Sequence, residues 1–209
     1  MKTISIKQAF KDGWGFFKVN KKALIASTFV LMVAGAFQKT PNKIFWEAGA
    51  SSALIFVAIW VVNLILQIGW IKMLLNLIDE EVTSVRELIQ HSGLFWKYAG
   101  TYILLALLVG VGLILFIVPG LYWALKYGFA PIIIVDEHMT IREAFKKSSK
   151  ITLGVKWKLL GLLIVMIFSN ILGALVIFVG LFVSIPVSML AYLSVYRKLI
   201  NNADSSYKA

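Results

Sequence analysis

The sequence predicts an all-α integral membrane protein with six transmembrane helices. Three observations support this prediction. Of the 209 residues, 60% are hydrophobic and 15% are charged, whereas a soluble domain is usually about 45–50% apolar and about 25% charged. The apolar residues lie in long uncharged runs, as membrane spans require. The Lys and Arg residues, which give a net charge of +11, mostly flank these runs.

This composition excludes a soluble globular domain, a disordered chain and a disulfide scaffold. The chain contains no cysteine, which rules out disulfides, thiolate metal sites and a cysteine nucleophile. In a soluble protein the positive charge would suggest a nucleic-acid partner. Basic residues beside apolar runs instead indicate topology control and attraction to anionic lipid. We therefore expect anionic membrane lipids as partners and no nucleic acid, in one membrane domain over residues 1–209.

The N-terminal third contains two single spans. The first apolar run, Ala23–Phe37, is slightly short for a span of about 20 residues. The second, Ser52–Ile71, has the expected length.

Two further apolar stretches are too long for one helix each. Tyr98–Leu125 is uncharged and continues past Lys126, and Leu159–Tyr196 is also uncharged. Turn signals lie near their centres, at Pro119-Gly120 and at Gly180. Each stretch therefore predicts a helical hairpin. The six predicted helices cover residues 22–38, 52–74, 98–117, 120–135, 157–178 and 181–198.

A short motif recurs outside the spans. Ser5–Lys11 matches Thr140–Lys146, and Ser84–Gln90 is a weaker third copy. Each copy starts with a hydroxyl residue that Glu or Gln follows three positions later, which is a capping box. An apolar stripe at helical spacing then follows, so we expect short amphipathic helices in the membrane interface. The chain thus divides into three units, each an amphipathic helix plus a transmembrane hairpin, at about 5–78, 84–136 and 140–199, with a tail at 200–209.

The polar faces of the first and third amphipathic helices are basic. We expect these side chains to lie at the membrane surface: Lys7, Lys11, Lys18, Arg142, Lys146, Lys147 and Lys150.

Charge also predicts the topology. With six spans, only Lys39 and Lys43 lie on one side of the membrane and Lys126 lies within a span, so the other side holds the remaining 18 of the 21 basic residues. The positive-inside rule then places both termini in the cytoplasm.

Lys126 is the clearest intramembrane charge, which makes it a candidate for binding an anion such as a lipid phosphate. The alternative is a lysine that reaches the interface or is bonded internally. Asn63 and Gln67 share a helix face, and Ser169 and Asn170 lie within the fifth helix. These polar side chains predict either interhelical hydrogen bonds or a polar cavity shared with Lys126. The candidate ligand-binding residues are Lys126, Asn63, Gln67 and Asn170.

Two acidic runs, Asp79–Glu81 and Asp136–His138, follow the second and fourth helices. We interpret them as solvated loop faces, since nothing in the sequence brings their oxygens together around a metal ion. No catalytic or nucleotide-binding motif is present. The sequence therefore predicts no enzyme activity, no metal and no cofactor.

The stretch from Ile117 to Leu160 is similar to a large bacterial family of six-helix membrane proteins. The family includes the membrane domain that precedes some glycerophosphodiester phosphodiesterases and YciC-like inner-membrane proteins. The matching features are Pro119-Gly120, Lys126, Asp136-Glu137, the Ala144–Ser148 segment and Trp157-Lys158. The resemblance implies a lipid-associated accessory role in a bacterial plasma membrane, with Lys126 where relatives tend to carry a basic residue. The hydrolase activity of some members belongs to an appended soluble domain and is not implied here.

The sequence therefore predicts a non-enzymatic bacterial membrane protein that engages lipid or another amphiphilic anion, as a transporter-like, lipid-handling or membrane-protection factor. The alternative is a structural or partner-binding subunit. An intramembrane enzyme is the weakest of the three hypotheses.

Overall fold

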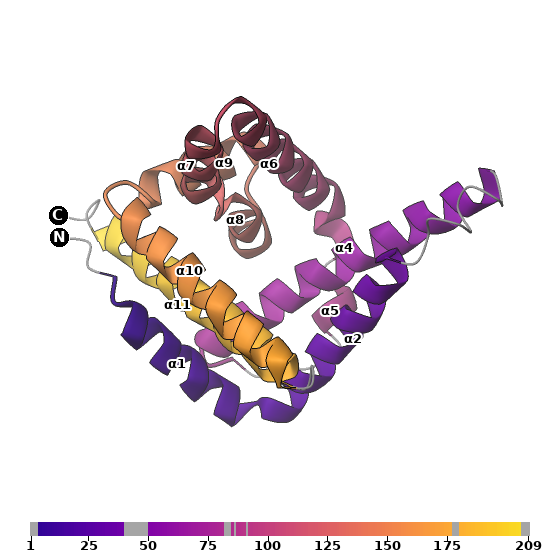
Figure 1. Cartoon of the computed structure of the whole chain (residues 1–209), viewed down its shortest axis with the longest axis horizontal. Coiled ribbons are helices and arrows are strands. Elements are labelled where there is room, and N and C mark those ends of the chain that lie inside the picture. Colours follow the sequence, from indigo (N-terminus) through magenta and orange to yellow (C-terminus); the bar gives the residue numbers. More distant parts are fainter. Residues whose placement is uncertain are drawn as a thin grey trace.

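The computed structural model describes residues 4–39, 50–81, 85, 87–90, 92–176 and 180–205, and this part of the chain is helical and contains no strand. Figure 1 shows the arrangement. The helices are α1 (Ile6–Val19), α2 (Lys21–Lys39), α4 (Ala50–Ile78), α5 (Glu87–Gln90), the 3₁₀ helix η1 (Ser92–Leu94), α6 (Phe95–Leu115), α7 (Ile117–Tyr127), α8 (Ala130–Glu137), α9 (Ile141–Ile151), α10 (Lys156–Leu175) and α11 (Leu181–Ser205).

Five helical segments are long and apolar enough to cross a membrane: Leu54–Ile78, Phe95–Leu115, Ile117–Glu137, Lys156–Leu175 and Leu181–Ala203. A sixth is present only if α1 and α2, which meet at 99°, form one bent span. The all-α character is thus confirmed for the described residues, and these apolar helices indicate a multi-pass membrane protein. Whether the chain has five or six spans depends on α2, which contains Ala23–Phe37, the short apolar run that is the first predicted span.

Both predicted hairpins form, and close glycine pairs join their helices. In the α6–α7 hairpin a Cβ on Gly112 would lie 2.7 Å from the Gly120 Cα. In the α10–α11 hairpin a Cβ on Gly180 would lie 2.8 Å from the Gly173 Cα. Backbones approach this closely only where small residues face each other.

The fourth predicted helix, 120–135, differs from the structure in two ways. The turn lies at Phe116, whose backbone is extended, and α7 begins at Ile117 with Pro119 in its first turn, where a missing N–H removes no hydrogen bond. The helix also stops at Tyr127 and resumes as α8 at Ala130, with Pro131 near its start. Proline lacks the N–H that a continuous helix would need, which accounts for the break.

The capping box is confirmed for the third copy, whereas the first copy forms only its N-cap half because the Gln8 side chain donates to Asp12 instead. Ser5 accepts a hydrogen bond from the Gln8 N–H at the start of α1. Thr140 and Glu143 form a reciprocal capping box at the start of α9. Ser84 lies outside the described residues, and only the short helices α5 and η1 follow it. The three-unit organisation stays a prediction.

The helix α1 packs lengthwise on α11 (Figure 1). A Cβ on Gly13 would lie 3.0 Å from the Ala191 N, so glycine allows this close approach. The Asp12 carboxylate pairs with the Lys198 ammonium at 2.7 Å. The first helix is therefore docked on the last.

The core surrounds α8. The residues from Ala130 to Val135 are all buried, which explains why this helix is apolar on every face. Phe129, just before it, stacks on Tyr192 of α11 with ring centres 4.6 Å apart.

Candidate functional site

Lys126 lies in the last turn of α7 and is half-buried. Its Nζ is 4.9 Å from the centre of the Tyr127 ring. Its backbone carbonyl accepts hydrogen bonds from Ser148 Oγ at 3.0 Å and from Thr152 Oγ1 at 3.2 Å. Carbonyls at a helix end lack intrahelical partners, so the break after Tyr127 creates the acceptor that fixes α9 beside Lys126.

A groove lies next to Tyr127, between α6, α7 and α9. It has a volume of about 280 Å³. We call it the basic groove, and its lining residues are Leu108, Tyr127, Phe145, Lys146, Ser149 and Lys150.

The chemistry of the basic groove is that of an amphiphilic anion site. Lys146 and Lys150 are four residues apart on one face of α9, and Arg142 continues that face; all three are exposed. Leu108 and Phe145 add an apolar wall. Cationic groups beside such a wall suit a phosphate head attached to an acyl tail.

A second lysine–tyrosine pair lies beside Lys126. Lys156, the first residue of α10, places its Nζ 3.8 Å from the centre of the Tyr122 ring. Tyr122 is one helical turn before Lys126 on α7. In the described part of the chain, neither lysine has an acidic partner within 4 Å. Both ammonium groups thus lie over tyrosine rings of α7 and add positive potential there.

The other predicted surface cations differ in their surroundings. Lys147 bonds both oxygens of the Glu137 carboxylate, at 2.5 and 2.6 Å, so its charge is neutralised within the protein. Lys7, Lys11 and Lys18 of α1 are exposed. Lys18 also lies 5.6 Å from the centre of the Trp14 ring.

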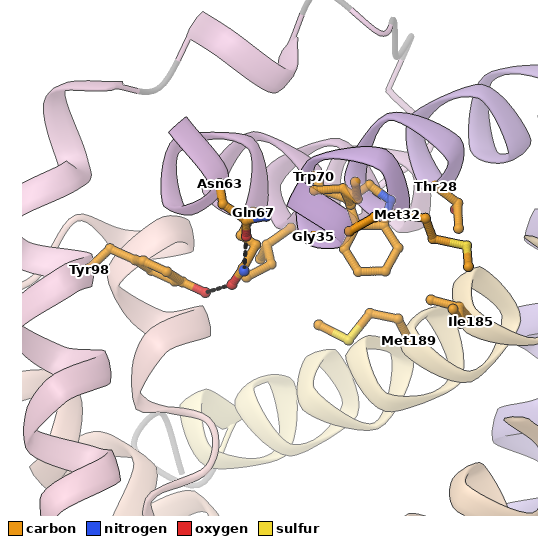
Figure 2. A pocket seen from close by; sticks show the side chains of 12 residues that line it. Thr28, Met32, Gly35, Asn63, Gln67, Trp70, Tyr98, Ile185 and Met189 are labelled. Atoms are coloured by element: carbon orange, nitrogen blue, oxygen red, sulfur yellow. Dashed lines mark hydrogen bonds between the residues drawn. The ribbon is translucent and has the colours of Figure 1, made fainter. Parts of the chain in front are cut away.

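Asn63 and Gln67 are joined on one face of α4, as their spacing predicts. The Gln67 Nε2 donates to Asn63 Oδ1 at 2.6 Å, and the Tyr98 hydroxyl of α6 donates to Gln67 Oε1 at 3.5 Å. All three line a cavity of about 660 Å³ between α2, α4, α6 and α11 (Figure 2). We call it the central cavity. Its other lining residues are Thr28, Leu31, Met32, Gly35, Ala36, Trp70, Ile71, Ile185 and Met189.

Lys126 and Asn170 do not line the central cavity. Ser188 of α11 donates to the Asn170 Oδ1 at 3.5 Å, which is the interhelical bond expected of such a residue. The predicted helix that contains Lys126 starts at residue 120 and runs unbroken to residue 135. The earlier start and the break after Tyr127 instead place Lys126 beside α9.

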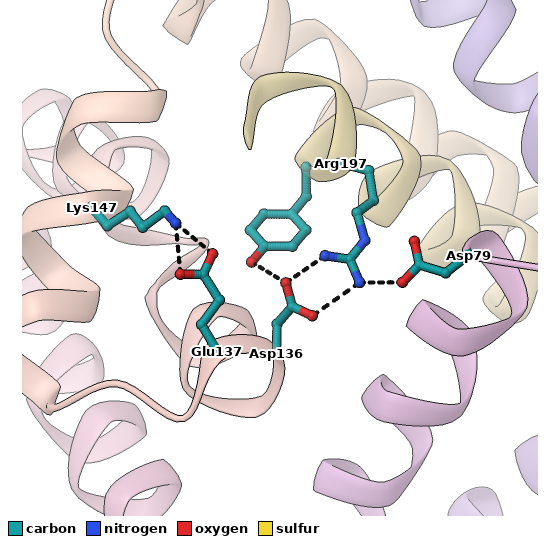
Figure 3. Close-up of polar contacts among 6 residues, drawn as sticks. Asp79, Asp136, Glu137, Lys147 and Arg197 are labelled. Atoms are coloured by element: carbon teal, nitrogen blue, oxygen red, sulfur yellow. Dashed lines mark hydrogen bonds and ion pairs between the residues drawn. The ribbon is translucent and has the colours of Figure 1, made fainter. Parts of the chain in front are cut away.

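An ionic cluster joins the ends of α4, α8 and α11 (Figure 3). Arg197 bonds Asp136 and also pairs with Asp79, and the Tyr196 hydroxyl donates to Asp136 at 2.8 Å. The side chain of Asp136 is only 7% exposed. The interpretation of the second acidic run as a solvated loop face is therefore wrong for Asp136. The sequence feature that indicates this cluster is Arg197, because a cation so close to an apolar stretch needs an acidic partner.

Among the described residues, no group of three or more His, Asp or Glu side chains is arranged to hold a metal ion. Comparisons of the chain with protein-family models, with curated proteins and with solved structures give no match.

Proposed function

We propose that this chain is a non-enzymatic membrane protein that binds an anionic phospholipid at the basic groove. The observation that carries the proposal is the grouping of Lys146 and Lys150 beside Tyr127, whose ring centre also lies 4.9 Å from the Lys126 Nζ. A phosphate would meet the two cations of α9, and its acyl chain would lie against Leu108 and Phe145. Charge-assisted bonds to phosphate are stronger than neutral ones.

We further propose, from the bias of basic residues and the family resemblance, that the protein lies in a bacterial plasma membrane with both termini in the cytoplasm. The basic groove would then face the cytoplasmic leaflet, whose anionic lipids attract basic segments. This location fits a lipid-handling or membrane-protection role.

The test is phospholipid retention. The protein is purified in a mild detergent, and bound phosphatidylglycerol and phosphatidylethanolamine are extracted and quantified. The double variant Lys146→Gln, Lys150→Gln should lose phosphatidylglycerol by tenfold or more, since each lysine contributes about 1 kcal/mol toward anionic lipid. The matched control, Lys7→Gln with Lys11→Gln, removes two charges from α1 and should retain it.

Equal loss in both double variants would show diffuse attraction rather than a site and would overturn the proposal. Copurification of a stoichiometric protein with no phosphatidylglycerol would also overturn it, in favour of a partner-binding subunit.

A further inference from the structure

We infer that the central cavity binds an uncharged amphiphile through a carbonyl oxygen. The cavity shares no lining residue with the basic groove, so this is a second site that stands independently of the proposed headgroup site.

Two buried polar atoms in the cavity wall need a partner. The indole Nε1 of Trp70 and the hydroxyl of Thr28 have no hydrogen-bond partner within the part of the chain that the structure describes. Trp70 is 9% exposed and Thr28 is 1% exposed. A buried donor without an acceptor is costly. Figure 2 shows the Trp70 ring in the space between α2, α4 and α11.

The type of polar group specifies the ligand atom. The indole N–H of Trp70 can only donate, and the Thr28 hydroxyl can donate as well as accept. An acceptor oxygen on the ligand could therefore pair with either group. A ligand that offers only donors would leave Trp70 unpaired.

The hydrogen-bonded series of Tyr98, Gln67 and Asn63 also presents a donor to the central cavity. Tyr98 donates to Gln67, and Gln67 donates to the carbonyl oxygen of Asn63. The remaining group of the Asn63 amide is an NH₂, which is a donor. The polar part of the cavity thus favours acceptors.

The absence of charged residues from the cavity lining narrows the class of ligand further. None of the twelve lining residues carries a charge, so a carboxylate or phosphate there would lack a counter-ion and would lose solvation. The rest of the lining is apolar and includes Met32 and Met189, whose flexible side chains adapt to irregular shapes. The fitting ligand has an ester, amide or quinone carbonyl on an apolar body.

The experiment uses delipidated full-length protein in detergent and three probes. Dioleoylglycerol supplies ester carbonyls, decylubiquinone supplies quinone carbonyls, and squalene supplies no oxygen. Binding is measured by co-elution on gel filtration and by the rise in the midpoint of thermal unfolding. The variants are Trp70→Phe, which keeps a ring and removes the donor, and Thr28→Val, which keeps the shape. Trp60→Phe, on the same helix but outside the lining, is the matched control.

At least one carbonyl probe should bind to the wild type and to Trp60→Phe, and squalene should bind far less. Trp70→Phe and Thr28→Val should each bind about five- to tenfold more weakly, the value of one hydrogen bond. The comparison of the two carbonyl probes shows whether the carbonyl of the ligand belongs to a glyceride or to a quinone.

Three results would overturn the inference: neither carbonyl probe binds, squalene binds as tightly as they do, or both variants keep wild-type affinity. The first of these would leave water as the partner of Trp70 and Thr28.

Discussion

The guanidinium of Arg197 holds the carboxylate of Asp136 with two hydrogen bonds, of 2.5 Å from Nη1 and 2.9 Å from Nη2. The fork of the guanidinium matches both carboxylate oxygens. Because Arg197 also pairs with Asp79, one side chain joins the ends of α4, α8 and α11. The cluster lies at the ends of these helices, where it holds the three helices in position relative to one another.

Asp136→Asn should destabilise the protein by about 3 kcal/mol, the lower end of the range for breaking a buried ion pair, since Arg197 keeps Asp79. The measurement is chemical unfolding in detergent. The control is Lys198→Gln, which breaks the exposed pair with Asp12 and should cost about 1 kcal/mol or less. Equal effects of the two substitutions would mean that the Arg197 cluster contributes no more than a surface pair.

Gly112→Ala should destabilise the α6–α7 hairpin by about 1–3 kcal/mol through overpacking, because the new methyl group would meet the backbone of Gly120. Gly110→Ala on the same helix has nothing within 4 Å of its new Cβ. It should be neutral or slightly stabilising, since alanine favours helix. Thermal unfolding of both variants distinguishes them, and tolerance of Gly112→Ala would show that the helices separate easily.

The number of spans is tested with accessibility reporters at both ends of the chain. The ion pair between Asp12 and Lys198 joins the first and last helices, so we expect both termini on one side of the membrane. That result requires an even number of spans, with the bent pair of α1 and α2 as the sixth. Reporters on opposite sides would support five spans and contradict the six-helix topology.

The capping box of α9 should weaken in acid. The side-chain hydrogen bond with Thr140 lowers the pKa of the exposed Glu143 carboxylate. Its stabilisation of the helix start is therefore complete above the ordinary pKa of glutamate and is lost as the pH falls through the lowered value. The hydrogen-exchange protection of the first turn of α9, relative to the intrinsic exchange rate at each pH, should fall over that range. Glu143→Gln should remove this pH dependence, and an unchanged profile in the variant would assign it to another group.

Periodicity and capping signals predicted the helices well because those signals are local. Ser5 and Thr140 start helices as expected, and the spacing of Asn63 and Gln67 places them on one face, where they bond. These predictions need only helix geometry.

The misplaced features depend on tertiary structure or on a missed local break. Pro131 signalled the break between α7 and α8, and without that break the prediction places Lys126 within one continuous helix over residues 120–135. The pairing of Arg197 with Asp79 spans 118 positions in the sequence. No periodic pattern reports such a contact, although a cation close to an apolar stretch indicates that a partner is needed.

The central claim, an anionic lipid at the basic groove, is tested most directly by photolabelling. A phosphatidylglycerol analogue with a photoreactive group near the phosphate is incorporated with the protein into vesicles, irradiated, and mapped by peptide mass spectrometry. Labels should concentrate at Tyr127 and along α9 from Phe145 to Lys150, with competition by unlabelled phosphatidylglycerol but not by phosphatidylcholine. Labels spread evenly over the exposed helices, or unaffected by the anionic competitor, would contradict it.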